Sequence, residues 1–114
     1  MKKIGGNHEL ELGIVVATQN ELGENEAVWF PIHTLKGFLD LSNGDSRYTS
    51  YNAKIQESSH FFICDYQELD SRIKVENSRV FDPKTQKFYD VLLIDNPMGL
   101  NKHLEFYLKY TGGQ

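Results

Sequence analysis

The last strand-like segment of the chain is the feature that most restricts its fold. Between His103 and Tyr110 the sequence HLEFYLKY places Leu104, Phe106 and Leu108 at every second position. A period of two puts these side chains on one face of a β-strand, whereas a helix needs a period near 3.6. The pattern predicts a half-buried antiparallel strand whose Leu104, Phe106 and Leu108 side chains enter a core.

The composition favours sheet over helix along the whole chain. Alanine, the best helix former, occurs three times in 114 residues, whereas Val, Ile, Thr and the aromatic residues together number 32. A chain of this length with 39% hydrophobic residues has enough apolar surface for one core. We therefore expect a single all-β domain over residues 1–114: a small antiparallel β-barrel or sandwich of about six strands.

Turn residues divide the chain into predicted hairpins. The turn Asp95–Gly99 joins a dense apolar run to the last strand, and the turn Asp82–Thr85 joins an earlier strand to the same run. A third hairpin is predicted at the turn Glu21–Asn25. The predicted strands other than the last cover residues 10–16, 28–32, 36–41, 59–66, 79–81 and 88–94.

Charge and cysteine content narrow the possible functions. The formal net charge is −4, from 12 basic and 16 acidic residues, which disfavours tight nucleic-acid binding. The longest aliphatic run, residues 91–94, is far shorter than the roughly 20 residues of a membrane span, so we expect no membrane contact. Cys64 is the only cysteine, and its neighbours Phe62 and Tyr66 predict a buried, unreactive thiol.

No residue pattern indicates catalysis, a metal site or a cofactor. The four histidines lie in separate segments. His60 and Cys64, the nearest pair of metal-ligand types, would stand about 13 Å apart on a strand, too far to share one ion. The sequence contains no phosphate-binding glycine motif and no nucleophile motif. We therefore expect that the protein is not an enzyme and uses neither a metal nor a cofactor.

One alternative from another functional class uses the aromatic residues. An OB-like single-stranded nucleic-acid-binding module stacks bases on aromatic side chains at the surface of a barrel. Aromatic residues that alternate along strands are more often core residues, and no basic groove accompanies them in this sequence, so this module ranks second. The candidate stacking residues are Phe61, Phe62, Tyr66, Phe106 and Tyr107.

The segment 42–59, SNGDSRYTSYNAKIQESS, interrupts the strand pattern with 18 mostly polar residues. Structureless loops longer than about 12–15 residues are uncommon in compact domains and are usually functional. A short surface helix over Thr49–Gln56 is the alternative structure for this segment. We expect the long polar loop between two strands to carry the function.

Three strings, LKGFLDLSNGD, YNAKIQESSHFFICDY and FYDVLLIDNPMGLNKHLEFYLKYTGGQ, resemble the head-tail joining, or head closure, proteins of long-tailed bacteriophages, especially those of Gram-positive hosts. The resemblance covers residues 28–114 and is most specific in the IDNPM turn, the HLEFYLK strand and the Gly-Gly ending. It implies a β-barrel that is made in the host bacterial cytoplasm and assembles with itself into a ring in the virion. The ring would lie between the portal and adaptor above and the tail proteins below. A tail terminator of the same connector region is the alternative.

The resemblance also implies a channel-facing loop. In related proteins a long inter-strand loop points to the channel axis, and its position corresponds here to residues 45–58. The charges of this segment sum to zero, which lets several copies approach one axis, and a net charge of −4 per copy lets double-stranded DNA pass without tight binding. The implied channel-facing residues are Asp45, Ser46, Arg47, Tyr48, Thr49, Ser50, Tyr51, Asn52, Ala53, Lys54, Ile55, Gln56, Glu57 and Ser58.

Overall fold

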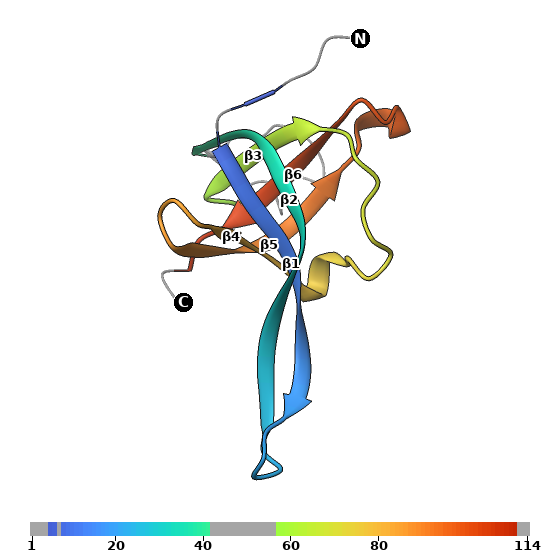
Figure 1. The fold of residues 1–114 in the computed structure, drawn as a ribbon. Coiled ribbons are helices and arrows are strands. Elements are labelled where there is room, and N and C mark those ends of the chain that lie inside the picture. Colours follow the sequence, from blue (N-terminus) through green and yellow to red (C-terminus); the bar gives the residue numbers. More distant parts are fainter. Residues whose placement is uncertain (1–4, 7, 42–56, 112–114) are drawn as a thin grey trace.

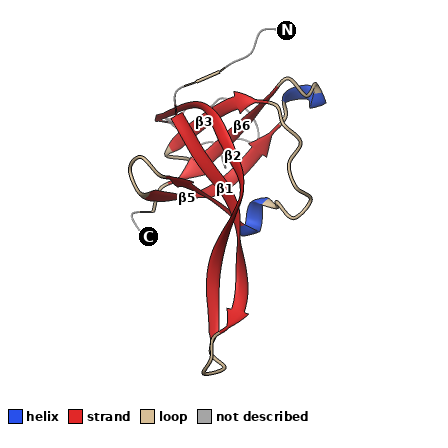
Figure 2. Cartoon of the chain, viewed as in Figure 1, coloured by secondary structure: helices blue, strands red, loops and turns tan. Residues whose placement is uncertain are grey.

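The computed structural model describes residues 5, 6, 8–41 and 57–111. In this part of the chain six antiparallel strands close into one barrel in the order β1-β2-β3-β6-β5-β4 (Figure 1). The elements are β1 (His8–Gln19), β2 (Asn25–Leu41), β3 (His60–Asp65), the 3-10 helix η1 (Val75–Asn77), β4 (Ser78–Asp82), β5 (Lys87–Asp95), the 3-10 helix η2 (Pro97–Gly99) and β6 (His103–Lys109). Figure 2 shows how far strands outweigh helix, and the predicted all-β class is confirmed as a barrel.

The three predicted hairpins are present. β1 pairs with β2, β4 with β5, and β5 with β6, each antiparallel. Two further antiparallel pairings, β1 with β4 and β2 with β3, join the hairpins, and the pairing of β3 with β6 closes the barrel. Closure leaves the barrel wall without a free edge, which removes the main route by which sheets associate non-specifically.

The division of β2 into two strands was wrong. Residues 28–32 and 36–41 belong to one strand of 17 residues, because β1 pairs with it without a break from Asn25 to Gly37. A bulge absorbs the change of register, since Leu12 faces His33 whereas Gly13 faces Pro31. Pro31 lies in the part of β2 that has β1 as its only strand neighbour among the described strands, because β2 pairs with β3 only from Gly37 onward, and proline is found on such edge segments.

Gly13 is needed at this bulge because the two strands approach closely. A Cβ atom at Gly13 would lie 2.2 Å from the carbonyl oxygen of Phe30 and 2.7 Å from the indole of Trp29. Any larger residue would therefore push β2 away from β1 at the point where the hairpin leaves the barrel. The glycine fixes the path of the hairpin.

The core contains the predicted face of the last strand. Leu104, Phe106 and Leu108 are 3%, 0% and 0% exposed, so the assignment of inward and outward faces is confirmed. The rings of Phe62 and Phe106 lie 6.2 Å apart between the paired strands β3 and β6. The other buried residues of the core are Leu10, Leu12, Leu35, Cys64, Val80, Tyr89 and Val91.

The predicted burial of Cys64 is confirmed. Its side chain is 2% exposed. Burial, followed by the negative charge of Asp65, raises the pKa of the Cys64 thiol to about 12. The reactive thiolate is therefore scarce at neutral pH.

The predicted loop at 42–59, including the implied channel-facing residues Asp45–Gln56 and the alternative helix Thr49–Gln56, lies outside the described residues apart from its last three positions. Ser58 is buried, and the Ser59 backbone N–H donates to the Leu108 carbonyl at 2.8 Å. These contacts attach the end of the segment to β6. Within the described ranges, no helix is long and apolar enough to cross a membrane.

Candidate interaction surfaces

The β1–β2 hairpin continues beyond the barrel as a two-stranded arm (Figure 1). The pairing of β1 with β4 ends at Ile14 opposite Ser78, whereas its pairing with β2 continues to Gln19 opposite Asn25. We call residues 15–29 the arm; it contributes to the elongated dimensions of 50 × 30 × 27 Å. An isolated two-stranded hairpin is only marginally stable in water, so the arm depends on contacts at its base or with a partner.

An aromatic cluster on the outside of the barrel supports the base of the arm. The Trp29 ring lies 6.0 Å from the Phe81 ring and 5.1 Å from the Phe88 ring, to which it is nearly perpendicular at 85°. The Trp29 indole N–H also donates to the Arg79 carbonyl at 3.1 Å. Because Phe81 and Phe88 belong to β4 and β5, these contacts fix the direction of the arm relative to the barrel.

The tip of the arm is ordered by one side chain. The Asn20 Oδ1 atom accepts hydrogen bonds from the backbone N–H groups of Leu22 and Glu24 at 2.9 and 3.0 Å. Its Nδ2 group donates to the carboxylates of Glu24 and Glu26 at 3.0 and 3.4 Å. Gly23 supplies the positive φ of 82° that the turn requires. The tip therefore presents Leu22, which is 84% exposed, beside fixed carboxylates.

The arm carries only negative charge. It contains Glu21, Glu24 and Glu26 and no Lys, Arg or His. The sequence itself carries a sign of this surface, because no Lys or Arg occurs between Lys3 and Lys36. A stretch of that length without a cation, on a ribbon that leaves the barrel, indicates a surface of one sign of charge.

The β4–β5 turn is a second charged projection. Lys84 lies in the turn, and Lys87 is the first residue of β5. Both lysines are exposed, and among the described residues neither forms an ion pair. The Lys87 ammonium lies 5.1 Å from the centre of the Tyr110 ring, which positions it at the end of the barrel. We call Lys84 and Lys87 the basic rim.

A buried carboxylate holds the β4–β5 turn in place. Asp82 is fully buried, lies 2.7 Å from the His8 Nε2 atom, and accepts the Lys84 backbone N–H at 2.9 Å. Burial alone would raise the pKa of Asp82, but the hydrogen bonds from His8, Lys84 and Thr85 outweigh it and lower the pKa. The ionised carboxylate therefore braces both the turn and the start of β1.

The η2 turn forms an apolar projection between β5 and β6. Met98 and Leu100 are 89% and 54% exposed. The turn is braced by Asn96, whose Nδ2 group donates to Asn101 Oδ1 at 2.7 Å and whose Oδ1 atom accepts the Asn101 N–H at 3.0 Å. An ordered turn that exposes two large apolar side chains is typical of a contact site for another protein.

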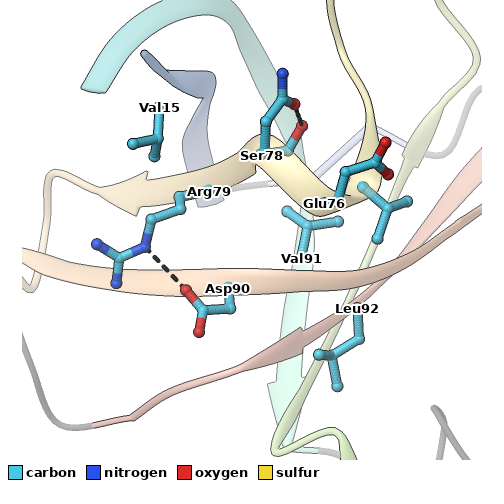
Figure 3. Close-up of a pocket in the computed structure, with 9 residues that line it drawn as sticks. Val15, Glu76, Ser78, Arg79, Asp90, Val91 and Leu92 are labelled. Atoms are coloured by element: carbon cyan, nitrogen blue, oxygen red, sulfur yellow. Dashed lines mark hydrogen bonds and ion pairs between the residues drawn. The ribbon is translucent and has the colours of Figure 1, made fainter. Parts of the chain in front are cut away.

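A pocket of about 540 Å³ lies at the base of the arm (Figure 3). Its charged pair, Arg79 and Asp90, is joined by an Nε–Oδ1 contact of 2.9 Å, so the two charges neutralise one another. The pair leaves no free cation in the pocket to attract an anionic ligand. The lining residues are Val15, Val75, Glu76, Asn77, Ser78, Arg79, Asp90, Val91 and Leu92.

The histidines have separate hydrogen-bond partners. His8 contacts Asp82, His33 accepts the Asp70 backbone N–H at 2.9 Å, His60 contacts the Ser59 hydroxyl at 2.9 Å, and His103 contacts Glu105 at 2.9 Å. In the described part of the chain, no group of three His, Cys, Asp or Glu residues is arranged to hold a metal ion.

The five candidate stacking residues do not form one platform, so that interpretation was wrong. Phe62 and Phe106 are core residues with 0% exposure, and Tyr66 packs against the core. The rings of Phe61 and Tyr107 are tilted by 54° with their centres 5.2 Å apart, and the Tyr107 hydroxyl donates to Glu105 at 3.1 Å. A carboxylate beside the remaining aromatic pair disfavours a nucleic-acid phosphate there.

Comparisons with known proteins identify the fold. No protein-family model matches the sequence, and no curated protein sequence matches it. The solution structure of protein SF1141 from Shigella flexneri 2a aligns with a TM-score of 0.64 and 15% identity over 100% of both chains. A chain in the virion of a native gene transfer agent particle aligns with a TM-score of 0.55 and 12% identity, over 90% of this chain and 91% of that one. The chain shares the barrel fold of these two proteins.

Proposed function

We propose that the chain is a structural virion protein that joins a phage head to its tail. Copies would form a ring at the connector, close the DNA exit channel after packaging and present a surface for the tail. The observation that carries this proposal is the match of nine tenths of the chain to a chain of a gene transfer agent virion. The resemblance of residues 28–114 to head-tail joining proteins supports a place at the junction of head and tail.

The charge of the chain suits a conduit for DNA. Every phosphate that a protein neutralises adds binding that must be broken when DNA leaves the head. A net charge of −4 per copy, repeated around a ring, repels DNA instead. In this proposal residues 45–58 face the channel, and double-stranded DNA passes without tight binding.

The described surfaces suit a protein that works through contacts. The arm and the η2 turn are both ordered projections, and each exposes a large apolar side chain, Leu22 and Met98. A ring element needs separate surfaces for its own neighbours, for the portal and adaptor proteins and for the tail proteins. We propose that the chain catalyses no reaction and requires no metal or cofactor.

Imaging of particles made without this chain tests the proposal. Filled heads that lose their DNA and carry no tails would support head closure, and expression of the wild-type chain in the same host should restore tailed particles. Normal heads with tails of uncontrolled length would instead identify a tail terminator. Normal infectious virions would refute both functions.

A further inference from the structure

We propose that the arm of one copy docks on the basic rim of the next copy. The ring would then form by repetition of this one contact between two different surfaces. This inference rests on the proposed function, because it names the contact between ring neighbours. It assigns roles to two projections, the arm at residues 15–29 and the basic rim of Lys84 and Lys87, that the barrel itself does not use.

The arm has apolar side chains on both faces. Val16 lies opposite Val28, and Ala17 lies opposite Ala27. Opposed residues share a face and successive residues alternate, so the two pairs point to opposite sides of the ribbon. The pairing of β4 with β1 ends at Ile14. Beyond that residue, none of the described strands pairs with the outer edge of β1 in the arm. A partner that covers one face would bury this surface and stabilise the hairpin.

Charge complementarity identifies the partner as a second copy. The carboxylates of the arm, Glu21, Glu24 and Glu26, are opposite in charge to the two exposed lysines of the basic rim, which lack ion pairs among the described residues. Every copy therefore carries both the acidic surface and its basic counterpart.

The contact must form between copies and not within one. β4 runs antiparallel to β1, with Ser78 opposite Ile14 and Phe81 opposite Glu11, so the turn that follows β4 lies toward the start of β1. Gln19, at the other end, is eight residues beyond Glu11, or roughly 27 Å along the strand. Figure 1 shows the arm tip and the β4–β5 turn on different sides of the molecule. A contact between two different patches is heterologous and yields a ring when the rotation closes.

Hydrogen bonds within each copy order both surfaces of the contact, the arm tip and the β4–β5 turn, before two copies associate. Asn20 fixes the carboxylates of Glu24 and Glu26, and Asp82 holds the backbone of the β4–β5 turn. Little conformational freedom remains to be lost at these positions on docking, which favours association. Complementary charges of this kind mainly orient the partners and speed their encounter, so the contact should weaken as salt rises.

Zero-length cross-linking tests the contact. A carbodiimide joins a carboxylate to an amine only where the two touch, and a mixture of isotope-labelled and unlabelled protein separates links between chains from links within a chain. We expect mass spectrometry to find links from Glu21, Glu24 or Glu26 to Lys84 or Lys87 that join labelled to unlabelled chains. Their yield should fall as salt is added.

Charge-reversal variants make the test specific. The arm variant Glu24→Lys/Glu26→Lys and the rim variant Lys84→Glu/Lys87→Glu should each lower the yield of linked chains roughly tenfold at low salt. An equimolar mixture of the two variants should restore it, because each reversed surface then meets an opposite charge. Lys102→Glu is the matched control, since Lys102 is exposed and belongs to neither surface. Circular dichroism checks that every variant folds.

The outcomes separate this inference from the proposed function. Links between chains that join other surfaces, an absence of links between chains, or a mixture no better than its separate variants would each overturn the arm contact. Head closure would still stand if particles made without the chain lose their DNA. Normal virions made without the chain would refute the function, whatever the cross-links show.

Discussion

Replacement of Trp29 by alanine should loosen the arm while the barrel stays folded. The change removes two aromatic contacts, with Phe81 and Phe88, each contributing about 0.5–1.5 kcal/mol, and one hydrogen bond to Arg79 that contributes about 0.5–1.5 kcal/mol. Complete truncation of a fully buried Trp costs about 3–5 kcal/mol, and Trp29 is only partly buried. We therefore expect the free energy of unfolding to fall by about 2–4 kcal/mol.

Two measurements distinguish a loosened arm from a damaged barrel. Urea unfolding followed by circular dichroism gives the total loss of stability, and native-state hydrogen exchange locates it. In Trp29→Ala the amides of residues 15–28 should exchange much faster, whereas the amides of β3 and β6 keep most of their protection. The control Trp29→Phe keeps a ring in place but loses the indole N–H, so it should cost about 1 kcal/mol.

Two results would refute this reasoning. Wild-type protection of residues 15–28 in Trp29→Ala would mean that the aromatic cluster does not support the arm. Equal loss of protection in the arm and in β6 would mean that Trp29 belongs to the barrel core and not to the base of the arm.

Four further predictions follow from the same structure. Phe106→Ala should destabilise the barrel by about 3–5 kcal/mol in thermal or urea unfolding, because Phe106 is fully buried, and Tyr107→Ala on the outer face should cost much less; the reverse order would invert the face assignment. Cys64→Ala should leave assembly intact, and the folded wild type should react only slowly with a thiol reagent, since burial and Asp65 raise the pKa of Cys64 to about 12; rapid labelling would contradict this. Asp82→Asn should lower stability at neutral pH by about 1–3 kcal/mol. The pKa of Asp82 in the folded protein lies below its ordinary value, so the stabilisation is present above about pH 4 and is lost as the pH falls through the folded pKa. The difference in unfolding free energy between wild type and Asp82→Asn should therefore shrink in acid. A difference that does not change with pH would contradict this role of Asp82. A Gly-Ser linker in place of residues 46–57 should leave the circular dichroism of the barrel unchanged yet reduce DNA retention in particles, and full retention would mean that this segment does not close the channel.

The parts of the fold that depend on local pattern could be predicted from the sequence. The alternation of Leu104, Phe106 and Leu108 specifies both a strand and its inward face, and turn residues at Asp82–Thr85 and Asp95–Gly99 specify hairpins. The continuity of β2 could not be predicted in this way. It results from pairing with β1 and from a bulge at Gly13, both of which depend on another strand.

The candidate surfaces were harder to predict, because the alternation of residues along a strand does not show whether another element covers that strand. Val16 and Val28 alternate like core residues, yet they lie on an arm, because the five residues of β4 are too few to cover the twelve of β1. The missing cations between Lys3 and Lys36 were the available sign. The exposure of Met98 could not be predicted, because it depends on how the η2 turn leaves the barrel.

A density map of the head–tail junction in particles that encode this chain tests most directly whether copies of the chain form a ring there. We expect a closed ring of copies of this barrel between head and tail, with the arm of each copy in contact with Lys84 and Lys87 of its neighbour. Absence of the chain from the junction, or its presence elsewhere in the particle, would contradict the account.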